Sequence, residues 1–157
     1  MRTLVKVLLH SMGIREVREA TDGAHAFDEL RLRAADIVIC DLLMSPLDGN
    51  DFTRLLRQAQ DSPNRFIPII MLTGYSERRK VEAARDAGVN EFLRKPITAR
   101  SLYQRVIEVV ERPRPFIQSA DYFGPDRRRR KADNPALHGS RRAEDRGESP
   151  DIVYLTE

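Results

Sequence analysis

Apolar residues in the first 112 positions recur at two spacings, one typical of helices and one typical of buried strands. Leu4 and Leu8, and likewise Val5 and Leu9, have the i, i+4 spacing of one helical face, in a helix that we expect to end at Gly13. In contrast, Ile37 to Cys40 form a continuous apolar run, as in strands that are covered on both faces. The same pattern predicts further helices within 26–32, 52–56, 77–87 and 102–110, and further strands within 14–20, 68–72 and 91–94.

Polar residues at the ends of these segments agree with the predicted boundaries. Asp22 and Thr98 stand just before helical stripes, where their side chains can cap the first turn, and Asp48 stands at a turn beside Gly49. Gly88 follows the predicted helix at 77–87, as a C-cap glycine would. Strands that alternate with helices imply right-handed crossovers, so we expect an α/β fold with a doubly wound parallel sheet.

The pattern changes near residue 112. From Ser119 to Pro150, apolar residues are sparse among arginines, acids, glycines and prolines, a composition that buries little apolar surface. We therefore predict one domain over residues 1–112 and a basic, polar and largely disordered tail over residues 113–157. Within this tail, the aromatic pair at 122–123 could dock on a partner or on the domain itself, and the apolar cluster at 152–155 could add a strand or stay unstructured.

Composition narrows the class of protein. The chain has 157 residues, and its 41% hydrophobic content is enough for one core. The net charge is only +3, which gives no strong indication of nucleic acid binding. Cys40 is the single cysteine, so an internal disulfide is excluded and a reducing compartment is favoured. No apolar run approaches the roughly 18 residues of a transmembrane segment and no signal-peptide cleavage pattern occurs, so we expect a cytoplasmic protein.

Three polar residues follow three of the predicted strands. Asp41, Thr73 and Lys95 each close an apolar run. Because ligands of open α/β sheets bind outside the carboxyl ends of the strands, we expect an acid, a hydroxyl and an amine to meet at one edge. Each residue alone also has a purely structural explanation, as a turn, a helix cap or a solvated lysine. Together they favour an aspartate that accepts a phosphoryl group.

These segments resemble the receiver domain of two-component response regulators. The resemblance runs from about Met1 to Arg112 and rests on several segments in the same order. They are Asp41-Leu42-Leu43-Met44-Ser45-Pro46-Leu47-Asp48-Gly49, Met71-Leu72-Thr73-Gly74 and Phe92-Leu93-Arg94-Lys95-Pro96, which are similar to the family's phosphoacceptor, switch-hydroxyl and lysine-proline segments. The resemblance implies a flavodoxin-like receiver fold.

The resemblance also implies a role for each residue. Asp41 would accept a phosphoryl group from a histidine kinase or a phosphotransfer protein, and the acyl phosphate would carry extra negative charge. Thr73 would donate a hydrogen bond to one phosphoryl oxygen, and Lys95 would neutralise another. Phe92 matches the family's switch aromatic, which turns inward as the threonine moves and thereby changes the surface of the last two helices.

The N-terminus departs from the family pattern. Similar domains begin with a strand that ends in two acidic residues, and this chain begins where they enter the first helix. In the family, the acidic pair, the phosphoacceptor and a backbone carbonyl, here that of Leu43, bind Mg²⁺. Asp41 and Leu43 alone should bind Mg²⁺ weakly. The missing strand would be central in the order 2-1-3-4-5, so we hypothesise that the gene encodes it upstream of Met1; an upstream reading frame without such a strand would refute this.

The sequence leaves three functional alternatives open. The first is a stand-alone receiver that is controlled by phosphorylation and acts by binding another protein, with a homodimer as one option. The second is a degenerate receiver that binds partners without phosphorylation. The third is nucleic acid binding through the basic run at 127–131, which nearby acids dilute. We do not expect an enzyme that converts a substrate, because no other set of acid, base and nucleophile occurs.

Overall fold

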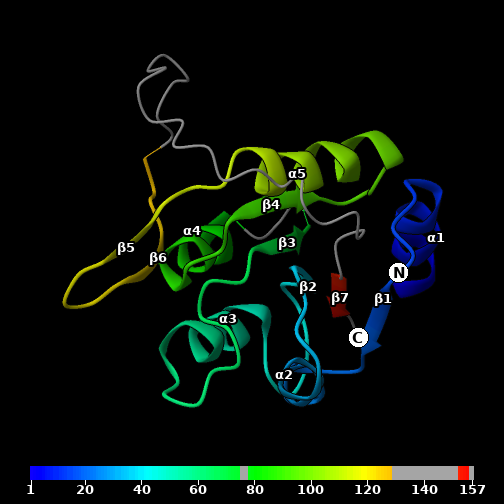
Figure 1. Cartoon of the computed structure of the whole chain (residues 1–157). Coiled ribbons are helices and arrows are strands. Elements are labelled where there is room, and N and C mark those ends of the chain that lie inside the picture. The colour runs from blue at the N-terminus through cyan, green and yellow to red at the C-terminus, as the bar shows by residue number, and fades with distance from the viewer. Residues whose placement is uncertain (75–77, 129–151, 156–157) are drawn as a thin grey trace.

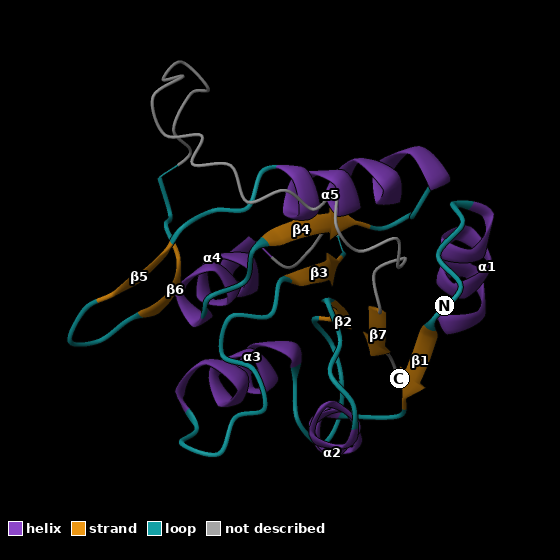
Figure 2. Ribbon diagram, viewed as in Figure 1, coloured by secondary structure: helices purple, strands orange, loops and turns teal. Residues whose placement is uncertain are grey.

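The computed structural model describes residues 1–74, 78–128 and 152–155. In these residues, five helices surround a parallel sheet of five strands in the order β1-β7-β2-β3-β4, and an antiparallel hairpin follows the last helix (Figures 1 and 2). The helices are α1 (Arg2–Ser11), α2 (Gly23–Leu32), α3 (Gly49–Gln58), α4 (Arg78–Ala87) and α5 (Ala99–Glu111). The strands are β1 (Val17–Ala20), β2 (Ile37–Asp41), β3 (Ile69–Thr73), β4 (Glu91–Arg94), β5 (Phe116–Gln118), β6 (Phe123–Pro125) and β7 (Ile152–Leu155).

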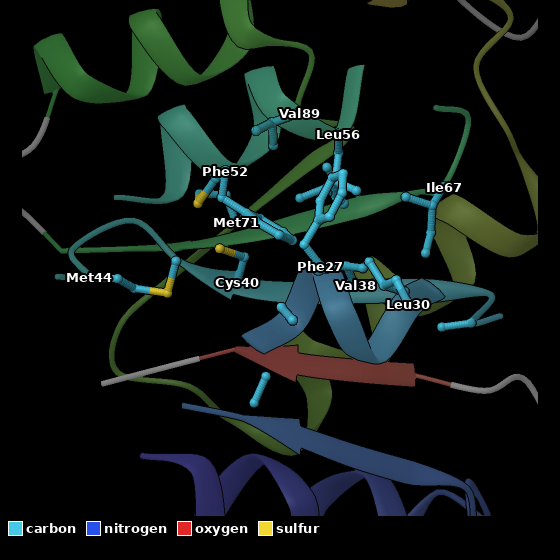
Figure 3. Close-up of a cluster of buried hydrophobic side chains, with 14 of the residues drawn as sticks. Phe27, Leu30, Val38, Cys40, Met44, Phe52, Leu56, Ile67, Met71 and Val89 are labelled. Atoms are coloured by element: carbon cyan, nitrogen blue, oxygen red, sulfur yellow. The ribbon is translucent and has the colours of Figure 1, made fainter. Parts of the chain in front are cut away.

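Helices cover both faces of the sheet, so the predicted doubly wound α/β architecture is confirmed. α1 and α5 pack on one face, where Leu9, Ile39 and Leu102 belong to one buried cluster. α2, α3 and α4 cover the other face with a cluster that includes Phe27 and Phe52 (Figure 3). Every residue of β2 and β3 is buried, because a strand between two helical layers needs apolar side chains on both faces.

The helix ends follow the local signals of the sequence. Asp22, Asp48 and Thr98 accept backbone N–H groups in the first turns of α2, α3 and α5, which would otherwise lack partners. Gly13 and Gly88 follow α1 and α4 with φ angles of +85° and +104°, a region that favours glycine. These helix starts and ends therefore carry residues that suit them.

The position between β1 and β2 is occupied by β7. All four β7 residues pair in parallel with both neighbours, and Leu155 is the Cα partner of both Ala20 and Cys40. Figure 3 shows β7 as the red strand between β1 and β2. In the flavodoxin-like order 2-1-3-4-5, this inner position is that of the first strand. Of the two alternatives for the apolar cluster at 152–155, the structure has the additional strand.

The hairpin of β5 and β6 packs against the rest of the domain through aromatic rings. The Phe66 centroid lies 5.3 Å from that of Phe116 and 5.2 Å from that of Phe123. The guanidinium groups of Arg57 and Arg65 lie over the rings of Phe116 and Phe123, at 5.0 and 4.1 Å from their centroids. Of the aromatic pair at 122–123, Phe123 therefore docks on the domain itself.

The structure describes part of the tail that is predicted from residue 113. Residues 113–128 are ordered against the domain because the hairpin contributes aromatic rings to a shared cluster, and residues 152–155 are ordered within the sheet. The rest of the expected tail, at 129–151 and 156–157, lies outside the described residues. Among the described helices, none is long and apolar enough to cross a membrane.

Arg57 connects several segments at the end of the molecule where the hairpin lies. Its side chain is fully buried, and it donates hydrogen bonds to the carbonyl oxygens of Gly88 and Arg65 and to Oδ1 of Asn90, at 3.1, 2.8 and 3.0 Å. Burial lowers the pKa of Arg57 to about 9, so the guanidinium is still charged at neutral pH. Oδ1 of Asn90 also accepts the N–H of Ile69, at the amino end of β3. The network therefore lies at the end of the sheet opposite Asp41.

Candidate functional site

Asp41 is the last residue of β2, and its carboxylate has a donor at each oxygen. Nζ of Lys95 lies 2.5 Å from Oδ2, and the backbone N–H of Leu43 donates to Oδ1 at 3.2 Å. The Asp41 side chain is 9% exposed and that of Lys95 is 29% exposed. The acid is therefore shielded by its neighbours, while the ammonium group that pairs with it is still accessible to water.

Lys95 reaches Asp41 from the end of β4, two strands away. Its backbone N–H donates to the carbonyl oxygen of Thr73 at 2.8 Å, which extends the β3–β4 ladder by one step. This backbone bond fixes the start of the lysine side chain at the carboxyl edge of the sheet. The ion pair thus spans β3 and joins the edges of β2 and β4.

Thr73 is the last residue of β3 and is buried, with 5% of its surface exposed. Its neighbour Leu72 is the Cα partner of Asp41, so Thr73 extends one residue past the acid on the next strand. The sequence predicted that an acid, a hydroxyl and an amine would share one sheet edge. The structure places all three there and shows direct contact between Asp41 and Lys95.

Phe92 lies within β4, where its Cα partner is Met71. Its ring is partly buried and packs against the core cluster under α2, α3 and α4. Phe92 thus contacts the core, and it lies on β4, the strand that directly precedes Lys95. Leu43, by contrast, is 43% exposed, and its contact with the site is the N–H bond to Asp41.

Gly49 is a site residue that the sequence reading assigned only to a turn. A Cβ atom at this position would lie 2.5 Å from the backbone oxygen of Asp41 and 2.7 Å from Sδ of Met71. Its N–H donates to the carbonyl oxygen of Leu42 at 3.1 Å. Only glycine lets the start of α3 approach the end of β2 so closely. The signal was a glycine at a helix start soon after the acid, but the approach itself depends on tertiary structure.

The described residues fit a divalent cation only in part. In residues 1–74, 78–128 and 152–155, no group of three or more His, Cys, Asp or Glu side chains could hold a metal ion. Mg²⁺ prefers near-octahedral oxygen ligation and commonly uses one or two carboxylates together with water. Asp41 provides one carboxylate, already paired with Lys95, so the donor set is sparse.

The buried Cys40 thiol, next to Asp41 in the sequence, is unreactive at neutral pH. Cys40 precedes Asp41 in β2, and none of its surface is exposed. Burial raises the pKa of the Cys40 thiol well above its usual value, and the nearby negative charge of Asp41 adds to this shift. The thiol is therefore protonated at neutral pH and acts as part of the core.

Comparison with known proteins places these features in a family. Residues 1–107 match the response regulator receiver domain. The chain is 33% identical to the chemotaxis protein CheY-3 of Vibrio cholerae over 112 residues, which cover 71% of this chain and 85% of the relative. It is 32% identical to the chemotaxis protein CheY of Pseudomonas aeruginosa, with 71% and 89% covered.

Comparison with solved structures indicates the same family. A response regulator of Chloroflexus aurantiacus is 30% identical and superposes with a TM-score of 0.64, covering 71% of this chain and 88% of that one. The receiver domain of the sensor histidine kinase PA1611 of Pseudomonas aeruginosa is 33% identical, with a TM-score of 0.58 and 68% and 84% covered; that domain has a magnesium ion in its active-site cleft. The chain therefore belongs to the response regulator receiver domain family.

Proposed function

We propose that Asp41 accepts a phosphoryl group from the phosphohistidine of a cytoplasmic histidine kinase or phosphotransfer protein. The ion pair between Asp41 and Lys95 at the carboxyl edge, beside Thr73, is the observation that carries this proposal. In the step, a carboxylate oxygen attacks phosphorus, a P–O bond forms and the P–N bond breaks. The leaving imidazole nitrogen keeps the electron pair and takes up a proton.

Lys95 and Thr73 act on the charge that this step brings to the site. An acyl phosphate replaces one negative charge with nearly two and adds three acceptor oxygens. The Lys95 ammonium, which now binds Oδ2 of Asp41, can move to a phosphoryl oxygen as a compact point charge. The hydroxyl of Thr73 can donate to another oxygen, because it lies at the same edge on the adjacent strand.

The resulting change would reach the surface through Phe92. Movement of the Thr73 end of β3 changes the space beside β4, where Phe92 is only partly buried. An aromatic side chain with two arrangements can bias the surface formed by α4, β4 and α5 between two states. A downstream protein that binds one of these states would respond to the phosphorylation.

We propose that Mg²⁺ assists the reaction and is held weakly. Asp41 and the backbone carbonyl of Leu43 would hold it, in line with the magnesium ion in the PA1611 receiver domain. When bound, the ion supplies positive charge that neutralises phosphoryl oxygens. Because Asp41 is the one carboxylate in this set, binding should be weaker than in a site with several acids.

The test is the intact mass of the chain after incubation with acetyl phosphate and Mg²⁺. We expect one added phosphoryl group in the wild type and none in Asp41→Asn. Asp51→Asn is the matched control, because Asp51 is an exposed acid on α3 that pairs with Arg54, and this variant should react as the wild type does. An unmodified wild type, or an equal addition in Asp41→Asn, would refute the assignment.

A second candidate is a receiver that binds its partner without phosphorylation. The sparse metal donor set among the described residues favours it. Such a protein would bind the same partner equally well as wild type and as Asp41→Asn, and acetyl phosphate would not change the affinity. The alternative of nucleic acid binding gains no support from Arg127, the first residue of the basic run, since it pairs with Asp86 and stacks on Tyr122.

A further inference from the structure

The inner position of the sheet between β1 and β2 is filled by a segment far away in the sequence. β7 pairs with β1 on one side and with β2 on the other, over all four of its residues. In the sheet order, β1 touches β2 only through β7. Without β7, two backbone edges inside the sheet would lose their hydrogen-bond partners, which is costly for buried groups.

The geometry allows the same chain to supply this strand. The described residues before β7 end at Arg128, and 23 residues, 129–151, separate it from Ile152. The hairpin before this segment packs beside Gly88 and Asn90, at the amino end of the sheet, and Ile152 enters the sheet at the same end, opposite Ile37. A chain of 24 peptide steps can span up to about 80 Å, well beyond the roughly 30 Å diameter of a small domain.

Covalent connection also favours an intramolecular strand over a strand from a second copy. A tethered segment experiences an effective concentration on the order of millimolar. A second copy would reach this level only in very concentrated protein. The backbone hydrogen bonds of β7 would be the same for a strand from the same chain and for one from a second copy. The covalent connection therefore decides in favour of the same chain.

β7 also borders the candidate site. It runs parallel to β2, and its last residue, Leu155, lies opposite Cys40, the residue before Asp41. The end of β2 is thus held between β3 on one side and β7 on the other. A strand that leaves this position would free one edge of the segment that carries the acid.

We propose that the space between β1 and β2 is a strand-binding slot, that residues 152–155 of the same chain occupy it, and that their occupancy positions Asp41 for phosphorylation. The last part rests on the proposed function, whereas the occupancy itself does not. The C-terminal segment would thereby be a positioning element of the receiver, and its release would switch the site off.

The slot can be tested with the single native cysteine. Cα atoms on neighbouring strands lie about 4.8 Å apart, within the range of about 4.4 to 6.8 Å that disulfides bridge. Leu155→Cys would place a second cysteine opposite Cys40. On mild oxidation, we expect an intramolecular disulfide, seen as a monomer that has lost two hydrogens and all free thiol.

Ile152→Cys is the matched control. Its Cα partner is Ile37, three residues before Cys40, which corresponds to about 10 Å along the strand. This variant should keep both thiols under the same conditions. Disulfide-linked dimers of Leu155→Cys would assign the slot to a second copy and overturn the proposal. An unreacted Leu155→Cys, or equal reaction of both variants, would overturn it too.

The effect on Asp41 needs a second comparison in the full chain. Val153→Pro removes a backbone donor from the middle of β7, whereas Val153→Ile keeps it. We expect amide exchange in β1 and β2 to accelerate at least about tenfold in the proline variant only. We also expect phosphorylation of Asp41 to slow by a similar factor.

The two readouts separate the proposals. If the wild type is never phosphorylated, the proposed function fails, and the disulfide and exchange results still decide the slot. If Val153→Pro is phosphorylated as fast as Val153→Ile while its exchange is accelerated, β7 fills the slot without positioning Asp41. Unchanged exchange in Val153→Pro would show that β7 does not hold the sheet together.

Discussion

Replacing Phe116 with alanine tests whether the β5–β6 hairpin is an integral part of the receiver. The Phe116 ring lies 5.3 Å from the Phe66 ring and 5.6 Å from the Phe123 ring, measured between centroids. It also covers the buried Arg57 guanidinium at 5.0 Å. The substitution removes three ring contacts at once and opens the Arg57 network to water, so we expect a clear loss of stability.

The magnitude follows from these contacts. Each aromatic pair contributes about 0.5 to 1.5 kcal/mol beyond burial, and a cation–π contact contributes about 0.5 to 2 kcal/mol. Truncation of a fully buried phenylalanine costs about 3 to 5 kcal/mol, but Phe116 is only partly buried. Because neighbouring contacts are not additive, we expect the free energy of unfolding to fall by about 2 to 3 kcal/mol.

The assay is urea unfolding followed by far-UV circular dichroism, since the chain has no tryptophan. With a slope of about 2 kcal/mol per molar urea, the midpoint should fall by about 1 to 1.5 M. Ile117→Ala is the control on the same strand, because this side chain is 42% exposed, and it should cost no more than about 0.5 kcal/mol. Equal midpoints for the two variants would refute the docking of the hairpin.

Three further changes probe the core and the site. Arg57→Met leaves two backbone carbonyls without their donor and should cost about 3 kcal/mol in the same urea assay, whereas the exposed Arg54→Met should stay within about 0.5 kcal/mol of the wild type. Gly49→Ala brings a Cβ to 2.5 Å from the Asp41 backbone oxygen, so it should cost at least about 1 kcal/mol and slow phosphorylation by acetyl phosphate; an unchanged rate would contradict this. Burial raises the pKa of the Cys40 thiol in the folded state, so just above the usual cysteine pKa of about 8.5 only the unfolded state loses the thiol proton. The free energy of unfolding should therefore fall by about 1 kcal/mol between pH 8.5 and 9.5. Cys40→Ala should abolish this part of the pH dependence.

The sequence predicted the parts of the receiver that depend on local signals. Continuous apolar runs identified β2 and β3, and the polar residues that follow them, Asp41 and Thr73, lie at one edge because all neighbouring strands are parallel. The caps at Asp22 and Thr98 were recognisable because each needs only one polar side chain before a helical stripe. Local chemistry was sufficient in these cases.

Other parts depend on contacts between distant segments, which composition does not reveal. The hairpin residues stand in a polar, arginine-rich region, yet Phe116 and Phe123 find a partner in Phe66 about 50 residues earlier. Arg57 would be assigned to a solvated helix face, but the hairpin and the turn after α4 bury it completely. The low average hydrophobicity of the hairpin region therefore did not indicate that its few aromatic rings pack against the domain.

The position of β7 is the strongest case, and it bears on how the site is controlled. Leu155 and its partner Cys40 are 115 positions apart, but closing a longer loop adds only about 0.6 kcal/mol for each doubling of length, so distance along the chain does not prevent the pairing. A strand of four residues, however, has few hydrogen bonds with which to offset that closure. β7 should therefore be the first strand of the sheet to open, and hydrogen exchange should show its amides to be less protected than those of β2 and β3. If they are, the least stable strand lies directly beside the one that carries Asp41, and any partner that captures residues 152–155 would act on the phosphoacceptor through β2.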